Sequence, residues 1–152
     1  MITLGQTPAV EEKLVTGEEL LAMGDIGRTE LIDGRISQMS PTAKTHGALE
    51  NRIAHQLNQY VYPRELGEVL VGEVGIYIQR NPDRIRAADV IFVSRERYQQ
   101  DPEEGYLGVA PELIIEVISP TDRWEQVREK MKTISRLGLT NFGYLSRSVK
   151  TF

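Results

Sequence analysis

The sequence predicts one α/β domain in which a single mixed β-sheet is flanked by helices. Apolar runs of strand length are interspersed with segments of helical periodicity, and no linker or internal repeat separates them. The chain has 152 residues, the length of one ordinary domain, and its 40% hydrophobic and 26% charged residues are typical of globular proteins. We expect residues 1–15 to be a partly ordered lead-in and residues 16–152 to form the domain.

The first half of the chain predicts two helices and a hairpin. Thr16 and Glu19 have the spacing of a capping box, which opens a short helix. Asp33-Gly34 is a strong hairpin turn, Thr45 is the expected cap of a longer helix, and Pro63 ends that helix. The expected elements are a helix at 18–23, strands at 29–33 and 35–39, and a helix from 45 to about 62.

The second half predicts most of the sheet. Gly72 and Gly75 mark bends or bulges, residues 94–110 form a polar loop with room for one helical turn, and Gly138 fits the position after a helix. The expected elements are strands at 68–72, 74–79, 88–93 and 113–118, a helix at 122–137, a strand at 141–145 and a stub at 148–152.

Composition excludes several classes of protein. The chain has no cysteine, which excludes a disulfide framework, a thiol nucleophile and a cysteine-ligated metal site. No stretch approaches the ~20 apolar residues of a membrane span, and the N-terminus lacks the pattern of a signal peptide. We therefore expect a cytoplasmic protein without a membrane partner.

The charge distribution is uneven. The net charge is −4, which is unlike that of a general nucleic-acid coat protein. Residues 121–152 carry seven basic and three acidic side chains, a net charge of +4. A basic face there could meet phosphates, and the alternative is a solvated helix whose charges pair at i,i+4.

Glu116 is the most informative residue. It lies within Leu-Ile-Ile-Glu-Val-Ile, the most apolar run of the chain. Strand alternation could turn it to solvent, but Ile114 and Ile118 would share its face and argue against solvation. An ionised carboxylate in a buried strand is costly unless it is paired or binds a metal, so the sequence favours a functional role.

Asp89 and Lys130 are weaker candidates. Asp89 precedes the next most apolar strand, where it could also be a strand-end cap or pair with Arg84 or Arg86. Two acids at the ends of two apolar strands can bind a hard cation such as Mg²⁺. Lys130 lies on the following helix, where Lys132 is equally available and a solvent-facing position is the ordinary alternative.

Other kinds of site find no support. His46 and His55 do not have the spacing of a usual zinc site. Ser40, Ser94 and Ser119 lack the Gly-x-Ser-x-Gly context of serine hydrolases, and no glycine-rich phosphate loop occurs.

Several blocks in order carry a family resemblance. They are Glu30-Leu31-Ile32-Asp33-Gly34, then Met39-Ser40-Pro41 with His46 shortly after, Ala88-Asp89-Val90-Ile91-Phe92-Val93, the run from Pro111 through Glu116 to Asp122, and Lys130 ahead of Gly138-Leu139. As an ordered set over about residues 16 to 145, they resemble the Uma-two family of restriction-endonuclease-like proteins, numerous in cyanobacteria. That family belongs to the PD-(D/E)XK nuclease superfamily.

The resemblance implies a restriction-endonuclease-like core and a DNA endonuclease that depends on Mg²⁺ or Mn²⁺. Asp89 and Glu116 would build the metal site, with Glu30 as a third acid. The superfamily lysine normally follows the second acid by two residues, a position held here by Ile118, so Lys130 would take its role. A homodimer is the expected assembly.

Three positions depart from the family pattern; the change at Ala88 is harmless, and the change at the C-terminus leaves alternatives open. Ala88 replaces the usual proline, Ile134 replaces a usual tyrosine, and Gly143 occupies a tryptophan position near a C-terminus that we interpret as truncated. A catalytically decayed, dimeric member of the same fold is therefore the second hypothesis. A carboxylate-pair glycosidase is the third, disfavoured because Lys130 has no part in it and the chain has one tryptophan.

Overall fold

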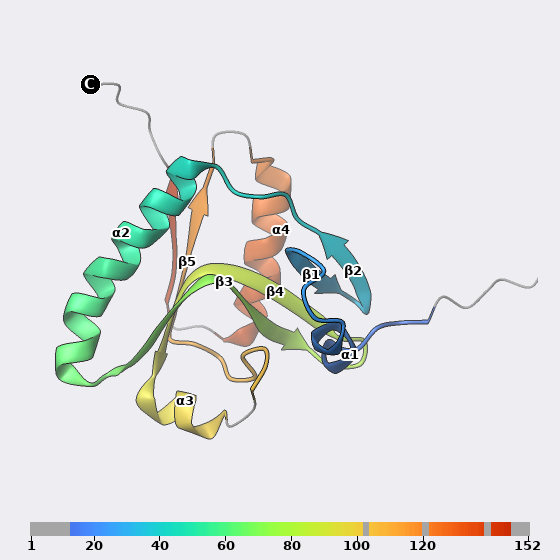
Figure 1. The fold of residues 1–152 in the computed structure, drawn as a ribbon, viewed down its shortest axis with the longest axis horizontal. Coiled ribbons are helices and arrows are strands. Elements are labelled where there is room, and N and C mark those ends of the chain that lie inside the picture. The colour runs from blue at the N-terminus through green and yellow to red at the C-terminus, as the bar shows by residue number, and fades with distance from the viewer. Residues whose placement is uncertain (1–12, 102–103, 120–121, 139–140, 147–152) are drawn as a thin grey trace, which may run out of the picture.

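The computed structural model describes residues 13–101, 104–119, 122–138 and 141–146 (Figure 1). It confirms the predicted α/β class, with one sheet and helices on both of its faces. The elements are α1 (Gly17–Ala22), β1 (Thr29–Ile32), β2 (Arg35–Gln38), α2 (Lys44–Val61), η1 (Tyr62–Arg64), β3 (Gly67–Gln79), β4 (Arg84–Ser94), α3 (Arg95–Gln100), β5 (Leu113–Ile118), α4 (Trp124–Ile134), η2 (Ser135–Leu137) and β6 (Asn141–Ser146).

Strand β4 organises the sheet. It pairs antiparallel with β3 along one edge, while β1 and β5 share its other edge. β1 meets β4 near its start, at Leu31 and Ile85, and β5 meets it further on, from Val90 onward. β2 and β6 extend the sheet at its two ends, and the β5–β6 pair is parallel. The sheet therefore opens beside β4 between β1 and β5.

Local sequence signals explain the first elements. The capping box predicted at the start of α1 is present, since the Thr16 side chain accepts from the Glu19 amide and the Glu19 side chain accepts from the Thr16 amide. Asp33 and Gly34 both have positive φ, as a two-residue hairpin turn requires. The prediction of Thr45 as a cap is wrong, because α2 begins one residue earlier and its N-cap, Ala43, offers no side-chain bond.

Two predictions about the sheet are also corrected. The expected strands at 68–72 and 74–79 are one strand, β3, which continues through a bulge where Gly72 and Glu73 both have positive φ. β4 begins at Arg84 rather than Ala88, because its charged first residues find partners inside the fold. Part of the expected polar loop forms α3, capped by the Ser94 side chain.

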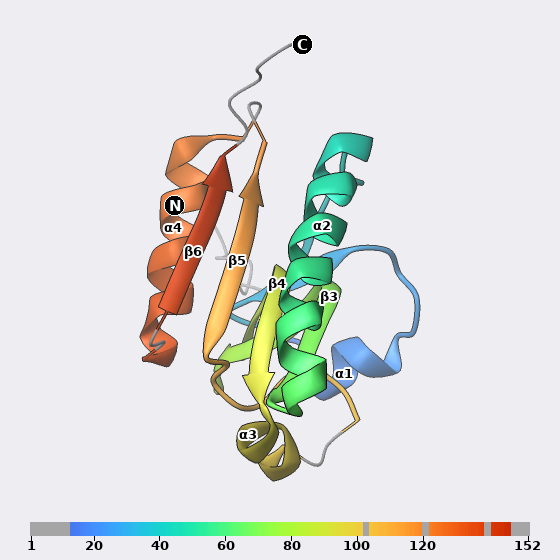
Figure 2. The same ribbon diagram turned by 90° about the vertical axis from the view of Figure 1, so that its left-hand side faces the viewer.

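The core lies on both faces of the sheet, which α4 and α2 cover from opposite sides (Figure 2). On one face, Ile114 of β5 and Ile91 of β4 pack with Ile134 at the end of α4. On the other, Ile115 and Val90 pack against Ala54 and neighbouring residues of α2. Alternation along β5 thus divides its side chains between α4 and α2, and it turns Glu116 toward the α4 face with Ile114.

Some expectations fall outside this description. The lead-in lies largely, and the stub at 148–152 entirely, outside the described residues. The extent of the single domain, residues 16–152, stays a prediction. None of the helices in the described ranges is both long enough and apolar enough to cross a membrane.

Candidate active site

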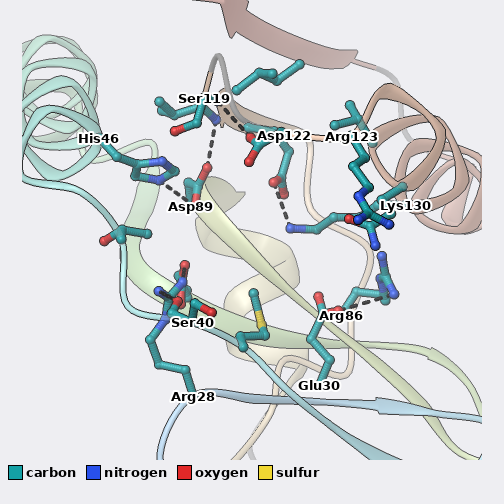
Figure 3. A pocket seen from close by; sticks show the side chains of 18 of the residues that line it. Arg28, Glu30, Ser40, His46, Arg86, Asp89, Ser119, Asp122, Arg123 and Lys130 are labelled. Atoms are coloured by element: carbon teal, nitrogen blue, oxygen red, sulfur yellow. Dashed lines mark hydrogen bonds and ion pairs between the residues drawn. The ribbon is translucent and has the colours of Figure 1, made fainter.

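A cavity of about 700 Å³ lies where the sheet opens beside β4 (Figure 3). Its walls come from the β1–β2 hairpin, the segment leading into α2, the end of β5 and the inner face of α4. It is lined by six acids and four bases as well as His46. The acids are Glu30, Glu73, Asp89, Glu116, Asp122 and Glu129, and the bases are Arg28, Arg86, Arg123 and Lys130.

The four residues predicted from the sequence meet in this cavity. Glu30 comes from β1, Asp89 from β4, Glu116 from β5 and Lys130 from α4, and all four line it. Lys132, which the sequence could not distinguish from Lys130, is exposed and does not line the cavity. Because side chains two residues apart on a helix point in different directions, Lys130 reaches the cavity and Lys132 does not.

Glu116 and Lys130 form a close ion pair. Lys130 Nζ donates to Glu116 Oε2 at 2.7 Å, and both side chains are largely shielded from solvent. The other carboxylate oxygen, Glu116 Oε1, is buried and has no hydrogen-bond partner among the described residues. One oxygen of this buried carboxylate is thus engaged, and the other is open to a ligand.

Burial raises the pKa of Glu116 to about 7. The ammonium of Lys130 opposes the rise in pKa, while the carboxylates of Asp89 and Glu30 add to it. Near neutral pH, Glu116 therefore exchanges a proton readily, and a second positive charge beside it would favour the ionised form.

Asp89 is held at the opening of the sheet. Its Oδ2 accepts from the amide of Val117 at 2.7 Å, so the side chain satisfies a β5 donor near the end of the pairing with β4. Its Oδ1 lies 3.1 Å from His46 Nε2. The alternative of a pair with Arg84 or Arg86 is wrong, because those arginines pair with Asp33 and Glu30 instead.

Glu30 is fully engaged by its neighbours. Its Oε1 accepts from the Ala87 amide at 2.9 Å, and its Oε2 lies 3.2 Å from Arg86 Nη1. Both Glu30 and Arg86 are buried at the cavity wall. Glu30 therefore fixes Arg86 beside the cavity, whereas Glu116 keeps an oxygen free.

The basic residues near the C-terminus divide into two groups. Arg123 lines the cavity, and no ion pair with it occurs in the described part of the chain. Arg128 and Arg136 do not line it, and the Arg128 side chain donates to the Trp124 carbonyl of its own helix. Of the basic residues that give segment 121–152 its positive charge, Arg123 and Lys130 line the cavity.

Two residues of α2 were missed as site candidates. His46 lines the cavity next to Asp89, and Glu50 lies one turn further along α2. One ligand atom from each of His46, Glu50 and Asp89 can be chosen so that all lie within 4.8 Å of one another. The sequence contained a pattern that could have identified them: His46 and Glu50 are four residues apart on a predicted helix, a spacing that places both side chains on one face.

The donor set of the cavity suits a divalent cation. Carboxylate oxygens are the ligands that Mg²⁺ and Mn²⁺ use in proteins. Glu116 Oε1 and His46 Nε2 are buried, line this cavity and lack hydrogen-bond partners within the described ranges. Such orphaned atoms are rare in folded proteins, and a bound cation would satisfy them.

Comparison with known proteins identifies the family. The profile of the Uma2 family, described as "Putative restriction endonuclease", matches residues 17–143. The crystal structure of a "putative nuclease belonging to DUF820" from Anabaena variabilis ATCC 29413 is similar, with a TM-score of 0.69 over 87% of this chain and 74% of that chain, at 20% sequence identity. No curated protein matches the sequence. Family and fold together support a nuclease and confirm the resemblance seen in the motifs, and the chain belongs to the Uma2 family.

Proposed function

We propose that this protein is a metal-dependent endonuclease that hydrolyses phosphodiester bonds of DNA in the cavity beside β4. One observation carries the proposal: Glu30, Asp89, Glu116 and Lys130 come from four separate elements and line the same cavity. Four charged residues that are distant in sequence rarely gather in a half-buried place without a chemical role.

Asp89 and Glu116 are the proposed ligands of Mg²⁺ or Mn²⁺. A divalent cation bound there would neutralise charge on a phosphate and lower the pKa of the attacking water. Asp89 is fixed for this task by the Val117 amide, and Glu116 by Lys130. Each of these hydrogen bonds uses one carboxylate oxygen. The second oxygen, Oδ1 of Asp89 or Oε1 of Glu116, is left to bind the cation.

Lys130 is the proposed electrostatic partner of the reacting phosphate. Its ammonium has three donors, and the Glu116 carboxylate accepts only one of them here. A remaining donor can orient a water molecule or bind a phosphate oxygen on which negative charge develops. Glu30 acts through Arg86, whose guanidinium it holds at the cavity wall.

The two alternatives from the sequence, a catalytically decayed member and a glycosidase, assign different roles to the charged residues of this cavity. In a catalytically decayed member, the Glu116–Lys130 and Glu30–Arg86 pairs would only hold the fold together. A glycosidase is favoured by no observation, because Glu116 is paired with a lysine that such a reaction does not use. A homodimer and a cytoplasmic location stay predictions.

A plasmid-nicking assay tests the proposal. Purified protein should nick supercoiled DNA with Mn²⁺ or Mg²⁺, lose the activity in EDTA and regain it when metal is restored. Asp89→Asn keeps the size of the side chain but removes its charge, and it should slow nicking by about 100-fold or more. Absence of metal-dependent nicking by the folded protein would favour the decayed member.

A further inference from the structure

The N-terminal part of α2 presents two potential metal ligands to Asp89. His46 and Glu50 are four residues apart on α2, so their side chains lie on the same face of the helix. One imidazole nitrogen and one oxygen from each carboxylate lie within 4.8 Å of one another. Ligand atoms at about 2.0–2.2 Å from one ion are at most ~4.4 Å apart, so small side-chain movements would close this group around a cation.

The Nε2 atom of His46 is buried and has no hydrogen-bond partner among the described residues. The His46 side chain is 10% exposed, and Nε2 lies 3.1 Å from Asp89 Oδ1, a contact that is an ion pair only when the ring is protonated. Figure 3 shows the ring directed at Asp89 from the α2 side. His55, on the same helix, is exposed and has Gln59 as a partner for its Nε2. A buried imidazole nitrogen that faces a carboxylate and has no hydrogen-bond partner is therefore a property of the His46 position rather than of both histidines on α2.

Glu50 is already oriented by the sheet. Its Oε1 accepts from the amide of Gly72 at 2.8 Å, at the bulge of β3. Hydrogen bonds of this kind fix the direction of a ligating carboxylate in metal sites. The bulge thus restricts Glu50 to the neighbourhood of His46 and Asp89.

We propose that His46 Nε2, Asp89 Oδ1 and the Glu50 carboxylate form a cation position that prefers a divalent transition-metal ion over Mg²⁺. An imidazole nitrogen is a good ligand for transition metals, whereas Mg²⁺ demands octahedral oxygen ligands and retains its water. Asp89 is shared between this position and the Glu116 side of the cavity. The biological meaning of the position rests on the proposed nuclease function, but its chemistry does not.

Metal binding without nucleic acid tests this inference. Calorimetric titrations with Mn²⁺ and with Mg²⁺ should be run on the wild type, His46→Gln and the control His55→Gln. The wild type should bind Mn²⁺ at least ~10-fold more tightly than Mg²⁺, His46→Gln should lose at least ~10-fold in Mn²⁺ affinity, and His55→Gln should bind like the wild type. Unchanged Mn²⁺ affinity in folded His46→Gln would overturn the inference.

A measurement on the wild type avoids dependence on variants that fold poorly. Pulsed electron paramagnetic resonance of the Mn²⁺-loaded protein should show coupling to an imidazole ¹⁴N, and His55→Gln should retain it. Absence of nitrogen coupling would overturn the inference. Nitrogen-coupled Mn²⁺ in a protein that never nicks DNA would sink the nuclease proposal alone, while nicking without histidine-dependent Mn²⁺ binding would sink this inference alone.

Discussion

Glu116 combines burial with neighbouring negative charges, and a single lysine opposes their effect. Its pKa of about 7 results first from loss of hydration, then from Asp89 and Glu30, with Lys130 acting in the other direction. In an unfolded chain, the same carboxyl titrates near its ordinary pKa of about 4.3. The folded protein without metal therefore binds more protons than the unfolded chain between these two pKa values.

This difference predicts a pH dependence of stability. Because the folded-state pKa is raised, the contribution of Glu116 to the free energy of unfolding is present below about pH 4.5 and is lost as pH rises toward about 7. The loss should amount to about 1–3 kcal/mol. In EDTA, Glu116→Gln should thus be more stable than the wild type at pH 8 and similar to it at pH 4.5.

Urea unfolding at several pH values measures this effect. Glu125→Gln, an exposed change on α4, serves as the control and should follow the wild-type pH profile. If Glu116→Gln destabilised the protein at pH 8, the pair with Lys130 would be a net stabilising ion pair, contrary to this account.

At the scale of elements, the site depends on how β3, β4 and α2 fit together. Gly67 begins β3 with a φ of 155°, and a Cβ built there would lie 2.0 Å from the Val93 carbonyl oxygen of β4. That oxygen is backbone and cannot move without disturbing the β3–β4 pairing. Gly47, in the first turns of α2, has open space around it instead.

Alanine at these two glycines should have opposite effects. Gly67→Ala should lower the free energy of unfolding by more than ~2 kcal/mol because it forces the two strands apart. Gly47→Ala should raise it by about 0.5–1 kcal/mol because alanine is the better helix former. Chemical denaturation measures both, and equal effects of the two changes would show that the β3–β4 contact is not as close as described.

The elements also show what sequence can predict here. The capping box at Thr16 and the Asp33-Gly34 hairpin are local patterns, and the structure confirms both. The bulge expected at Gly72 is confirmed, but the division into two strands was wrong, since a glycine with positive φ marks a bulge and a strand end equally well. The early start of β4 was missed, because it depends on Arg84 finding Asp33, a partner 51 residues away.

In the candidate site, too, local patterns could be predicted from the sequence, and contacts between distant residues could not. Glu116 stood out because a carboxylate in an apolar strand is costly wherever the strand lies. The choice of Lys130 over Lys132 followed from the family resemblance, and the geometry of α4 agrees with it. His46 and Glu50 could not be assigned to Asp89 from spacing alone, because their meeting depends on how α2 packs across the sheet.

At the scale of the whole molecule, the proposed function requires an acidic protein to bind DNA, which is also acidic. The net charge of −4 opposes DNA binding in general, so the proposed function predicts that phosphate contacts come from the few bases at the cavity. Arg123 lines the cavity, while Arg136 is exposed away from it. If DNA enters the cavity, Arg123 is placed to contact a phosphate and Arg136 is not.

Salt-dependent binding distinguishes the two arginines. The logarithm of DNA affinity, measured by fluorescence anisotropy with Ca²⁺ in place of the catalytic metal, should fall linearly with the logarithm of salt concentration. Arg123→Gln should reduce that slope by about 0.9 because one phosphate contact is lost, and Arg136→Gln should leave it unchanged. Equal slopes in all three proteins would place the DNA away from the cavity mouth.

The most direct test of the central claim compares two lysines in one nicking assay. Lys130 contacts Glu116 in the cavity, and Lys132 is exposed two residues away on the same helix. With Mn²⁺ and folded protein verified by circular dichroism, Lys130→Met should slow nicking by about 100-fold or more, while Lys132→Met should nick like the wild type. If Lys130→Met nicked DNA at the wild-type rate, or if both variants lost activity equally, the proposed role of Lys130 in the active site would be contradicted.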